Sequence, residues 1–466
     1  MLTKLHIKNF KAWKDTGEIR LAPLTVLFGT NSGGKTSIPQ LLLLLKQTAE
    51  SSDRQRALHL GDSRSLVDVG TFDDVVHNHD VSNPLEFSLG WRCAEDLVVN
   101  DPLKESQRYK GDTLVFAAKI EADSKHQPRT AELHYELHSG GERMIDVALA
   151  EKEGGHKARK KPEFELSSIS YSLVRHTGRA WGLPEPVRFY GFPDEVAAYY
   201  QNTAFTADFV LELERMLKSM FYVGPLREYP KRLYLWSGEV PDHVGVKGER
   251  AIEAILAAQD RSFNWKSKQK TKTLPVMVAD RLKSMGLIHD FQVKPLGEHR
   301  KEYEVLVRTN PRLPEVKLTD VGFGVSQILP VIVESLYVPR RSIVIFEQPE
   351  IHLHPRVQAD LADLFVDAIR AREGGAPRDC QFIVESHSEH FLRRLQRRIA
   401  EEELSNEDAA LYFVHTKGAQ AHVEKLDVDL FGNIRNWPEN FFGDEMADLV
   451  ARTEAQARRV EREPKQ

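Results

Sequence analysis

The residues best suited to chemistry form a glycine-rich stretch near the start of the chain. Residues 29–36 read Gly-Thr-Asn-Ser-Gly-Gly-Lys-Thr and match the pattern G-x-x-x-x-G-K-[ST] in full. In such a loop the backbone N–H groups wrap phosphates, the lysine reaches the β- and γ-phosphates, and the last hydroxyl can ligate magnesium at a helix N-terminus. We therefore predict a site for ATP and Mg²⁺ made by these residues: Gly29, Asn31, Gly33, Gly34, Lys35, Thr36 and Ser37.

A second candidate segment follows an apolar stretch much later in the chain. Residues 343–346 are Ile-Val-Ile-Phe, and Glu347-Gln-Pro-Glu350 come directly after them. In P-loop proteins, a carboxylate at the carboxyl end of a buried parallel strand holds magnesium and its attacking water. Many strands end in acids, so this pattern indicates a metal site only because the chain also contains the phosphate loop. Together they predict that Thr36 and Glu347 share the metal ion.

A third segment places a histidine after another apolar stretch. Ser-His-Ser occupies positions 386–388, directly after Phe-Ile-Val-Glu. If both stretches are parallel strands, His387 lies at the same edge of the sheet, where an imidazole can hydrogen-bond a γ-phosphate or a water. A lone histidine is more often structural, so the predicted role depends on the two other segments.

These residues need a strand, a glycine loop and a helix in that order. Residues 3–10 and 18–28 alternate or cluster apolar side chains as strands do, and residues 35–48 are predicted to form an apolar helix. The pattern of a parallel sheet returns near Lys317. The nucleotide-binding core is therefore expected to combine both ends of the chain.

Between these ends the pattern changes. Short alternating segments from about 84 to 172 predict an antiparallel β-rich insertion, and residues 195–220 and 249–287 are expected to be helical. The expected organisation is a core of residues 1–80 and 315–400, an insertion and helical lobe at 81–314, and a small C-terminal extension at 401–466.

Composition limits the class of protein. The 466 residues exceed one ordinary core, and 41% hydrophobic with 29% charged residues and a net charge of -5 fit a water-soluble globular chain. Two cysteines, Cys93 and Cys380, leave no disulfide framework. The N-terminus lacks the apolar region of a signal peptide, and the run at 41–45 is too short to cross a bilayer. We expect a cytoplasmic protein with no membrane partner.

The three segments together resemble the ABC-type ATPases of the SMC, RecF and OLD superfamily. The resemblance covers roughly the first 80 residues, including Leu5-His-Ile-Lys-Asn-Phe-Lys11, and residues 315–395. It implies an α/β fold: an ABC-type P-loop ATPase head with a mostly parallel core sheet, an antiparallel β-rich insertion and a helical lobe. It also implies that Asp-Val-Gly-Phe-Gly-Val-Ser-Gln at 320–327 is a signature loop, which touches the γ-phosphate bound by the opposite subunit. In this loop Gly322 and Gly324 would allow close backbone approach, and Ser326 would offer a hydroxyl.

Residues 347–355, 384–390 and 437–442 more narrowly resemble bacterial standalone OLD-like ATPases. Several of those are subunits of anti-phage defence systems and work with a separate nuclease, so the resemblance implies a separate effector protein. The OLD type carries a C-terminal TOPRIM nuclease, but too few residues follow His390 for a domain of typical size. A nuclease within this chain is therefore not expected.

One position departs from the family. The residue after the magnesium-linked acid is usually the catalytic glutamate, and here it is Gln348. An amide can orient water but cannot take a proton, so we expect slow hydrolysis and a long-lived ATP-bound state. Glu350 and Glu385 both remain open as alternative bases.

Two further patterns admit competing interpretations. His352 and His354, with His387 and His390, suggest zinc, but alternating histidines before a proline fit a subunit-contact loop better. The four arginines in residues 392–399 suit phosphates of DNA or acids of a partner, and equally a solvated helix face balanced by Glu401 to Glu403.

The leading hypothesis is an ATP-driven dimerisation switch. A homodimer or higher oligomer would hold ATP between Lys35 of one subunit and the signature loop of another, and closure would control an effector such as a nuclease. One alternative is a RecF-like repair ATPase that clamps DNA directly, which the negative net charge disfavours. Another is a scaffold that binds ATP without hydrolysing it.

Overall fold

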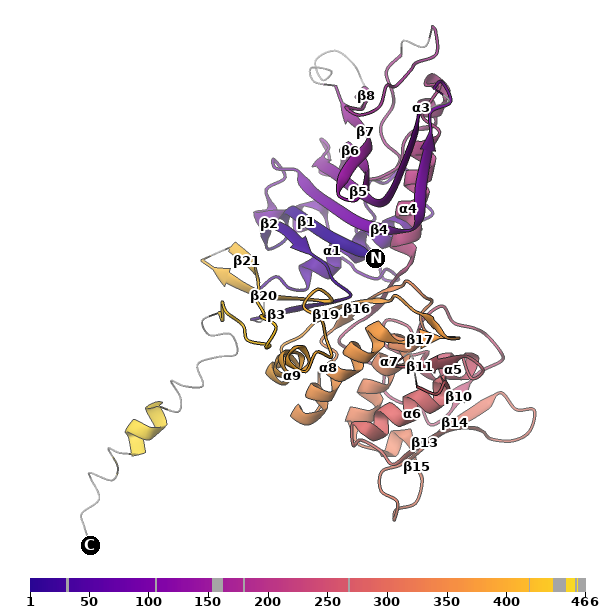
Figure 1. Cartoon of the computed structure of the whole chain (residues 1–466), viewed down its shortest axis with the longest axis vertical. Helices are drawn as coiled ribbons and strands as arrows, with labels where there is room; N and C mark the ends of the chain where they lie inside the picture. Colours follow the sequence, from indigo (N-terminus) through magenta and orange to yellow (C-terminus); the bar gives the residue numbers. More distant parts are fainter. Residues whose placement is uncertain are drawn as a thin grey trace.

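The phosphate loop belongs to a six-stranded sheet in the middle of the molecule (Figure 1). The computed structural model describes residues 1–30, 33–104, 107–152, 162–178, 181–266, 269–418, 420–438, 450–456 and 459. The strand order is β21 (Gln420–Lys425), β20 (Ala409–Lys417), β3 (Leu24–Gly29), β19 (Gln381–Glu385), β16 (Ile343–Glu347) and β9 (Met220–Val223). Neighbouring strands are parallel except β20 and β21. The carboxyl ends of the five parallel strands therefore meet at one edge of the sheet.

The central strands of this sheet are buried on both faces, which explains their continuous apolar sequences. Alternate residues enter two separate cores: Leu27, Ile345 and Ile383 on one face, and Val26, Val344 and Val384 on the other. The first core is shared with α1 (Ser37–Glu50), and the second with α7 (Phe323–Tyr337), α8 (Pro355–Arg370) and α9 (Glu389–Ala400). Helices therefore cover both faces of the sheet whose carboxyl edge carries the loops.

A seven-stranded antiparallel sheet lies above the core in Figure 1. Its order is β2 (Trp13–Arg20), β1 (Leu2–Phe10), β4 (Leu85–Asn100), β5 (Arg108–Ala122), β6 (Pro128–Ser139), β7 (Glu142–Glu151) and β8 (Phe164–Ser167). Buried and half-buried residues alternate along β5, as expected for a sheet with one covered face. Its apolar face packs in the same core as α1 and as α4 (Phe205–Lys218), which follows the short α3 (Asp194–Tyr199).

The lower lobe in Figure 1 is helical with short strands. Its elements are β10 (Tyr234–Leu235), α5 (Ala251–Ala257), β11 (Ser262–Asn264), β12 (Lys272–Thr273), α6 (Leu274–Ser284), β13 (Asp290–Pro295), β14 (Glu302–Arg308), β15 (Val316–Lys317), η3 (Leu318–Asp320), β17 (Arg372–Glu373) and β18 (Ala376–Pro377). Two further short helices, α2 (Phe72–Val75) and η1 (His77–His79), follow α1. Within the described ranges every helix is too short or too polar to span a bilayer.

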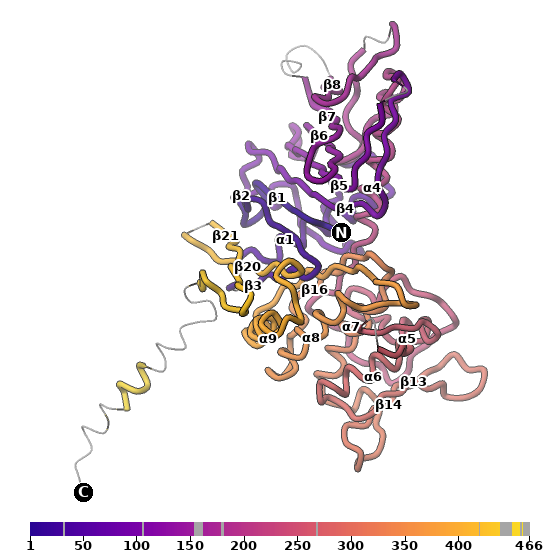
Figure 2. Tube along the Cα trace, viewed as in Figure 1, coloured from indigo at the N-terminus to yellow at the C-terminus, as the bar shows by residue number. Residues whose placement is uncertain are grey.

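The expected α/β head, with a mostly parallel core sheet, a β-rich insertion and a helical lobe, is confirmed. The domain limits stay a prediction, and the sheets differ from them in two places. β9 lies inside the predicted insertion, and β20 and β21 lie in the predicted extension, yet all three join the core sheet. Figure 2 shows the amber β20 beside the indigo β3, with which it pairs over six residues.

One predicted strand is also wrong. The expected strand at 18–28 is divided between β2 and β3, which belong to different sheets. Pro23 stands between them, and proline lacks the N–H that a continuous ladder requires. The chain therefore crosses from the antiparallel sheet to the core sheet at this point.

Candidate active site

The loop after β3 holds Lys35 close to its own backbone. The ammonium donates hydrogen bonds to the carbonyl oxygens of Gly29 at 3.0 Å and Thr30 at 2.6 Å, and the side chain is only 3% exposed. Burial lowers the pKa of Lys35, while the charges of Glu385 and Glu350 oppose that shift. The loop therefore presents a buried cation beside two acids. Asn31, predicted to bind nucleotide, lies outside the described residues.

Glycine is required where this loop leaves the sheet. Gly29 has a φ of 143°, and a Cβ there would lie 1.9 Å from the Val414 carbonyl oxygen of β20. Gly34 has a φ of 98°, and its Cβ would lie 3.0 Å from that of Ala12. Both values fall where side chains are disfavoured, so Gly29 lets the loop pass close to β20 and Gly34 lets it pass close to Ala12. Gly33 has a hydrogen bond from its N–H to the Thr30 carbonyl at 3.3 Å, and Ser37 begins α1.

Two carboxylates lie side by side at the ends of neighbouring strands. Glu347 of β16 and Glu385 of β19 are register partners. The Thr36 hydroxyl donates to Glu385 Oε1 at 3.1 Å, and the Tyr222 hydroxyl donates to Glu347 Oε2 at 2.6 Å. Burial, followed by the charge of Glu347, raises the pKa of Glu385 to about 7. Thr36 thus contacts Glu385, whereas the sequence predicts that Thr36 and Glu347 share a metal ion.

Glu350 and His387 connect the turns that follow these two strands. Glu350 Oε1 accepts from the Ser386 hydroxyl at 2.9 Å and from the His387 backbone N–H at 2.6 Å. Its other oxygen is buried without a hydrogen-bond partner among the described residues. Burial raises the pKa of Glu350 and lowers that of His387, where the charge of Lys35 acts in the same direction. Gln348 lies between the acids with a φ of 43°, and its N–H donates to the Glu385 carbonyl at 2.9 Å.

The predicted signature loop begins α7. Gly322 is the N-cap residue of this helix, and a Cβ on Gly324 would lie 3.7 Å from the Leu353 side chain. Phe323 is 38% exposed, and its ring lies 5.2 Å from that of His352. The Ser326 hydroxyl, expected as a ligand donor, donates instead to the Phe323 carbonyl at 2.8 Å. Within one chain, the loop therefore packs beside the segment that follows the acidic strand.

Two of the four histidines of the zinc interpretation, His352 and His354, have other contacts. His354 is the N-cap residue of α8 and accepts a hydrogen bond from the Arg356 N–H at 3.3 Å. In the part of the chain that the structure describes, no group of three or more His, Cys, Asp or Glu side chains is arranged to hold a metal ion. A magnesium ion needs fewer protein ligands, since phosphates and waters complete its shell.

Sequence reasoning missed two residues at this edge. Tyr222 is the third residue of β9, and Arg227 follows the same strand after a Gly-Pro turn. Both are buried, and both interact electrostatically with Glu347. The strand-like Phe-Tyr-Val before Gly224 was the available signal, but nothing local places β9 beside β16.

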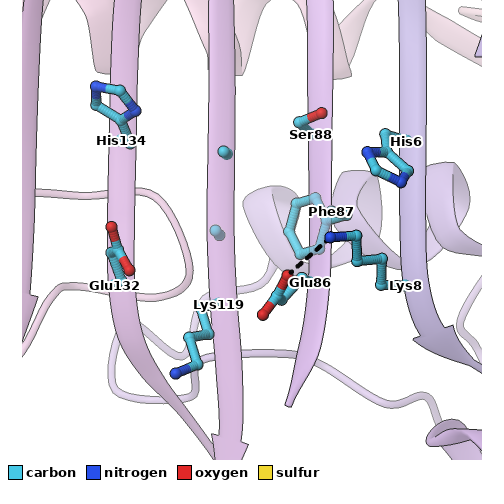
Figure 3. Close-up of a pocket in the computed structure, with 10 residues that line it drawn as sticks. His6, Lys8, Glu86, Phe87, Ser88, Lys119, Glu132 and His134 are labelled. Atoms are coloured by element: carbon cyan, nitrogen blue, oxygen red, sulfur yellow. Dashed lines mark ion pairs between the residues drawn. The ribbon is translucent and has the colours of Figure 1, made fainter. Parts of the chain in front are cut away.

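A separate hollow lies on the open face of the antiparallel sheet (Figure 3). Lys8 and Glu86 form an ion pair of 3.8 Å there, and both side chains are more than 40% exposed. Lys119, Glu132 and His134 line the rest of the hollow in Figure 3. These charges of both signs are typical of a solvated sheet face and offer no convergent set of groups.

Comparison with known families agrees with this geometry. Residues 1–165 and 250–392, more than half of the chain, match the family described as AAA ATPase domain. Residues 404–451 match a family described as protein of unknown function (DUF3696). No curated protein matches the sequence.

Solved structures with a similar arrangement include three SMC heads. An SMC head bound to the C-terminal winged-helix domain of ScpA has 9% identity and a TM-score of 0.43, covering 92% of this chain and 98% of that one. The SMC head domain from Thermotoga maritima has 11% identity and a TM-score of 0.39, with coverages of 92% and 99%. An Smc head with an extended coiled coil, bound to the C-terminal domain of ScpA from Pyrococcus furiosus, has 9% identity and a TM-score of 0.41, with coverages of 97% and 99%.

Proposed function

This chain belongs to the AAA ATPase domain family, and on that premise we propose that it is a slowly hydrolysing, ATP-driven dimerisation switch of the SMC, RecF and OLD type. One observation carries the proposal: a phosphate loop, the half-buried Glu347 and the buried Glu350 and Glu385 converge at one edge of a parallel sheet. Buried titratable groups with shifted pKa values gather at functional sites because burial and charge there serve chemistry.

The nucleotide would bind over the loop after β3. Lys35 is the main cation for the β- and γ-phosphates, and it must exchange its two backbone acceptors for phosphate oxygens when it binds. Gly33, Gly34 and Ser37 place N–H groups around the phosphates, at the N-terminus of α1.

The donor set fits magnesium. The Thr36 hydroxyl and the carboxylates of Glu347 and Glu385 are oxygen ligands of the kind that Mg²⁺ prefers. A bound ion would neutralise charge on the triphosphate and on these crowded acids. We assign Thr36 and Glu347 as its ligands, with Glu385 beside them.

For hydrolysis, the chain must orient a water and accept its proton. Gln348 can orient the water, and the buried carboxylates Glu350 and Glu385 each have one oxygen without a partner among the described residues. A raised pKa makes either a better proton acceptor than an ordinary carboxylate. His387, also at this edge, is proposed to contact the γ-phosphate.

Closing the nucleotide site around ATP would need a second copy of the chain. The signature loop with Gly322, Gly324 and Ser326 would then meet the γ-phosphate bound by the partner. We propose that the closed pair controls a separate effector such as a nuclease, in anti-phage defence. This finer role rests on the resemblance of residues 347–355 and 384–390 to OLD-like ATPases.

A second candidate, a DNA-binding repair ATPase, loses support from α9. All four of its arginines are engaged by acids of the same chain: Arg393 by Glu389, Arg394 by Asp360 and Asp363, Arg397 by Glu401, and Arg398 by Asp363 and Glu401. Phosphates would have to displace these partners.

The test uses the full-length protein. We expect light scattering to show a dimer with ATP and Mg²⁺ but not with ADP, and turnover that is measurable but slow. A protein that stays monomeric at saturating ATP would refute the switch, and zero turnover with tight binding would favour the scaffold.

A further inference from the structure

One buried arginine at the site has no hydrogen-bond partner among the described residues. Arg227 is only 7% exposed, and none of its three guanidinium nitrogens reaches an acceptor. Burial lowers the pKa of Arg227 to about 10, although the charges of Tyr222, Glu347 and Glu350 act against this shift. Even beside acids, a buried guanidinium whose N–H donors have no acceptors is costly, so this position needs an explanation.

The segment around Arg227 is held in place on both sides. The N–H of Gly224 donates to the Val246 carbonyl at 2.8 Å, and the N–H of Glu228 donates to the Lys247 carbonyl at 2.9 Å. Leu226 is 71% exposed, whereas the arginine beside it is buried. An apolar residue outside and a cation inside reverse the usual distribution, which indicates that the guanidinium serves the interior site.

Other buried arginines of this chain have partners. Arg378 is fully buried, and its guanidinium donates to the carbonyl oxygens of Ser335, at 2.8 Å, and Val338. Arg281 is 9% exposed and pairs with Asp367. Where an arginine has a structural role, this fold supplies acceptors, so Arg227 does not fit that role.

The surroundings of Arg227 favour an anion with several oxygens. Glu347 accepts from Tyr222, and one oxygen of Glu350 accepts from Ser386 and His387. The other oxygen of Glu350 has no hydrogen-bond partner among the described residues, so it does not accept from Arg227 either. Glu350 interacts electrostatically with both Lys35 and Arg227, so the two cations approach the same carboxylate. A phosphate group near that carboxylate would match the fork of N–H donors on a guanidinium.

We propose that Arg227 binds the terminal phosphate of the ATP held by Lys35 of the same chain, and so makes the site distinguish ATP from ADP. This inference rests on the proposed nucleotide site. β9 brings Arg227 to the edge beside β16, and Tyr229, two residues later, places its ring 5.4 Å from that of Phe323 in the signature loop. Arg227 would therefore couple the terminal phosphate to the segment that contacts this loop.

The test compares nucleotide affinities of the full-length protein and its variants. In Arg227→Ala we expect ATP affinity to fall by about tenfold or more while ADP affinity changes less than about twofold, as for the loss of one charged hydrogen-bonding partner. Arg227→Lys keeps the charge without the fork and should recover only part of the preference for ATP. The control is Lys231→Ala: Lys231 is half exposed, pairs with Glu228 at 3.2 Å, and should leave both affinities unchanged.

The outcomes separate this inference from the proposed function. If the unmodified protein binds ATP, Lys35→Ala abolishes binding and Arg227→Ala weakens ATP and ADP equally, Arg227 is only structural and the inference is overturned. If the unmodified protein does not bind ATP at all, the proposed function itself fails. Should Arg227→Ala not fold, as judged by circular dichroism, Arg227→Lys supplies the same comparison, and an undiminished preference for ATP in that variant would contradict a role for the fork.

Discussion

The two sheets of this molecule place their charged groups in opposite ways. On the antiparallel sheet, Lys8 pairs with Glu86 and Lys119 with Glu121, on strands that keep one face toward water. On the core sheet, polar groups collect at the carboxyl edge, where Lys35 and Glu350 are buried. On the antiparallel sheet the charged side chains are solvated, whereas at the carboxyl edge of the core sheet they are buried close together.

The contrast indicates which part of the molecule can perform chemistry. Strands buried on both faces leave polar side chains only at their ends, and parallel strands bring those ends together. Exposed ion pairs contribute little to stability and do not perturb one another strongly. Buried acids such as Glu385 instead acquire shifted pKa values that acid–base chemistry can use.

The largest effect should come from removing the loop cation. In Lys35→Ala we expect ATP turnover to fall by roughly 10²–10³-fold, since the ammonium is a preorganised charge at the phosphates. Lys119→Ala removes an exposed lysine of the antiparallel sheet and should leave turnover unchanged. A phosphate-release assay on both variants checks the contrast, and equal rates would refute the nucleotide site.

A bulky residue in the signature loop should have the next largest effect. Gly324→Leu would place a side chain near Leu353 and into the proposed approach to the partner's phosphate. We expect the ATP-dependent dimer to disappear and turnover to fall by about 10²-fold through misplacement alone. Ser124→Leu, in an exposed turn of the insertion, is the control for added apolar surface. A normal dimer in Gly324→Leu, by light scattering, would contradict the composite site.

Exchanging the amide at the acidic edge should have a smaller effect in the opposite direction. Gln348→Glu should raise turnover by about tenfold, because a carboxylate can take the proton that an amide cannot. Glu347→Gln should lower turnover and weaken magnesium binding, and it also alters the acceptor of the Tyr222 hydroxyl.

The Gln348→Glu variant has a further consequence for the switch. A closed state that decays faster would hold its effector for less time, so output should fall while turnover rises. If the unmodified protein already turns over quickly and Gln348→Glu adds nothing, Glu350 or Glu385 is already the base. Glu350→Gln and Glu385→Gln would then identify which.

Local spacing was enough to predict the loop and its helix. The pattern at 29–36 fixes glycines, lysine and threonine relative to one another, and the predicted helix at 35–48 corresponds to α1. The acidic strand was likewise visible as an apolar run that ends in Glu347. Such features depend on residues close in the chain, where periodicity and turn chemistry decide the structure.

Contacts between distant segments could not be predicted in this way. Thr36 meets Glu385, and Tyr222 meets Glu347, only because parallel pairing brings their strands together. The sequence did not identify Arg227 as a site residue, because only the surrounding structure shows that this cation is buried. The two strands β20 and β21 were assigned to an extension because nothing local shows that β20 pairs with β3 and β21 with β20.

The smallest predicted effect concerns two buried acids, one under each sheet. Asp146 of the antiparallel sheet is 1% exposed, and hydrogen bonds from Ser170 and Ile169 outweigh its burial and lower its pKa. Glu334 of α7 is fully buried and accepts the Val244 N–H at 3.0 Å, while its other oxygen has no hydrogen-bond partner among the described residues. Arg378 and Tyr337 interact with it electrostatically. Burial raises the pKa of Glu334 to about 8, so the native state holds a proton that the unfolded chain releases.

The two acids should therefore give stability profiles of different shape. With a native pKa of about 8 against an ordinary 4.5, Glu334 destabilises the fold progressively as pH rises from 5 to 8, by at most about 1.4 kcal/mol per pH unit. Glu334→Gln keeps the acceptor without the proton, so it should match the unmodified protein at pH 5 and exceed its stability at pH 8. Asp146→Asn should instead lose the same amount of stability at every pH in this range. The stability that comes from a depressed pKa is fully present above about pH 4 and varies with pH only below that value. Urea unfolding at four pH values measures both, and parallel profiles for Glu334→Gln and the unmodified protein would show that Glu334 is ionised in the native core.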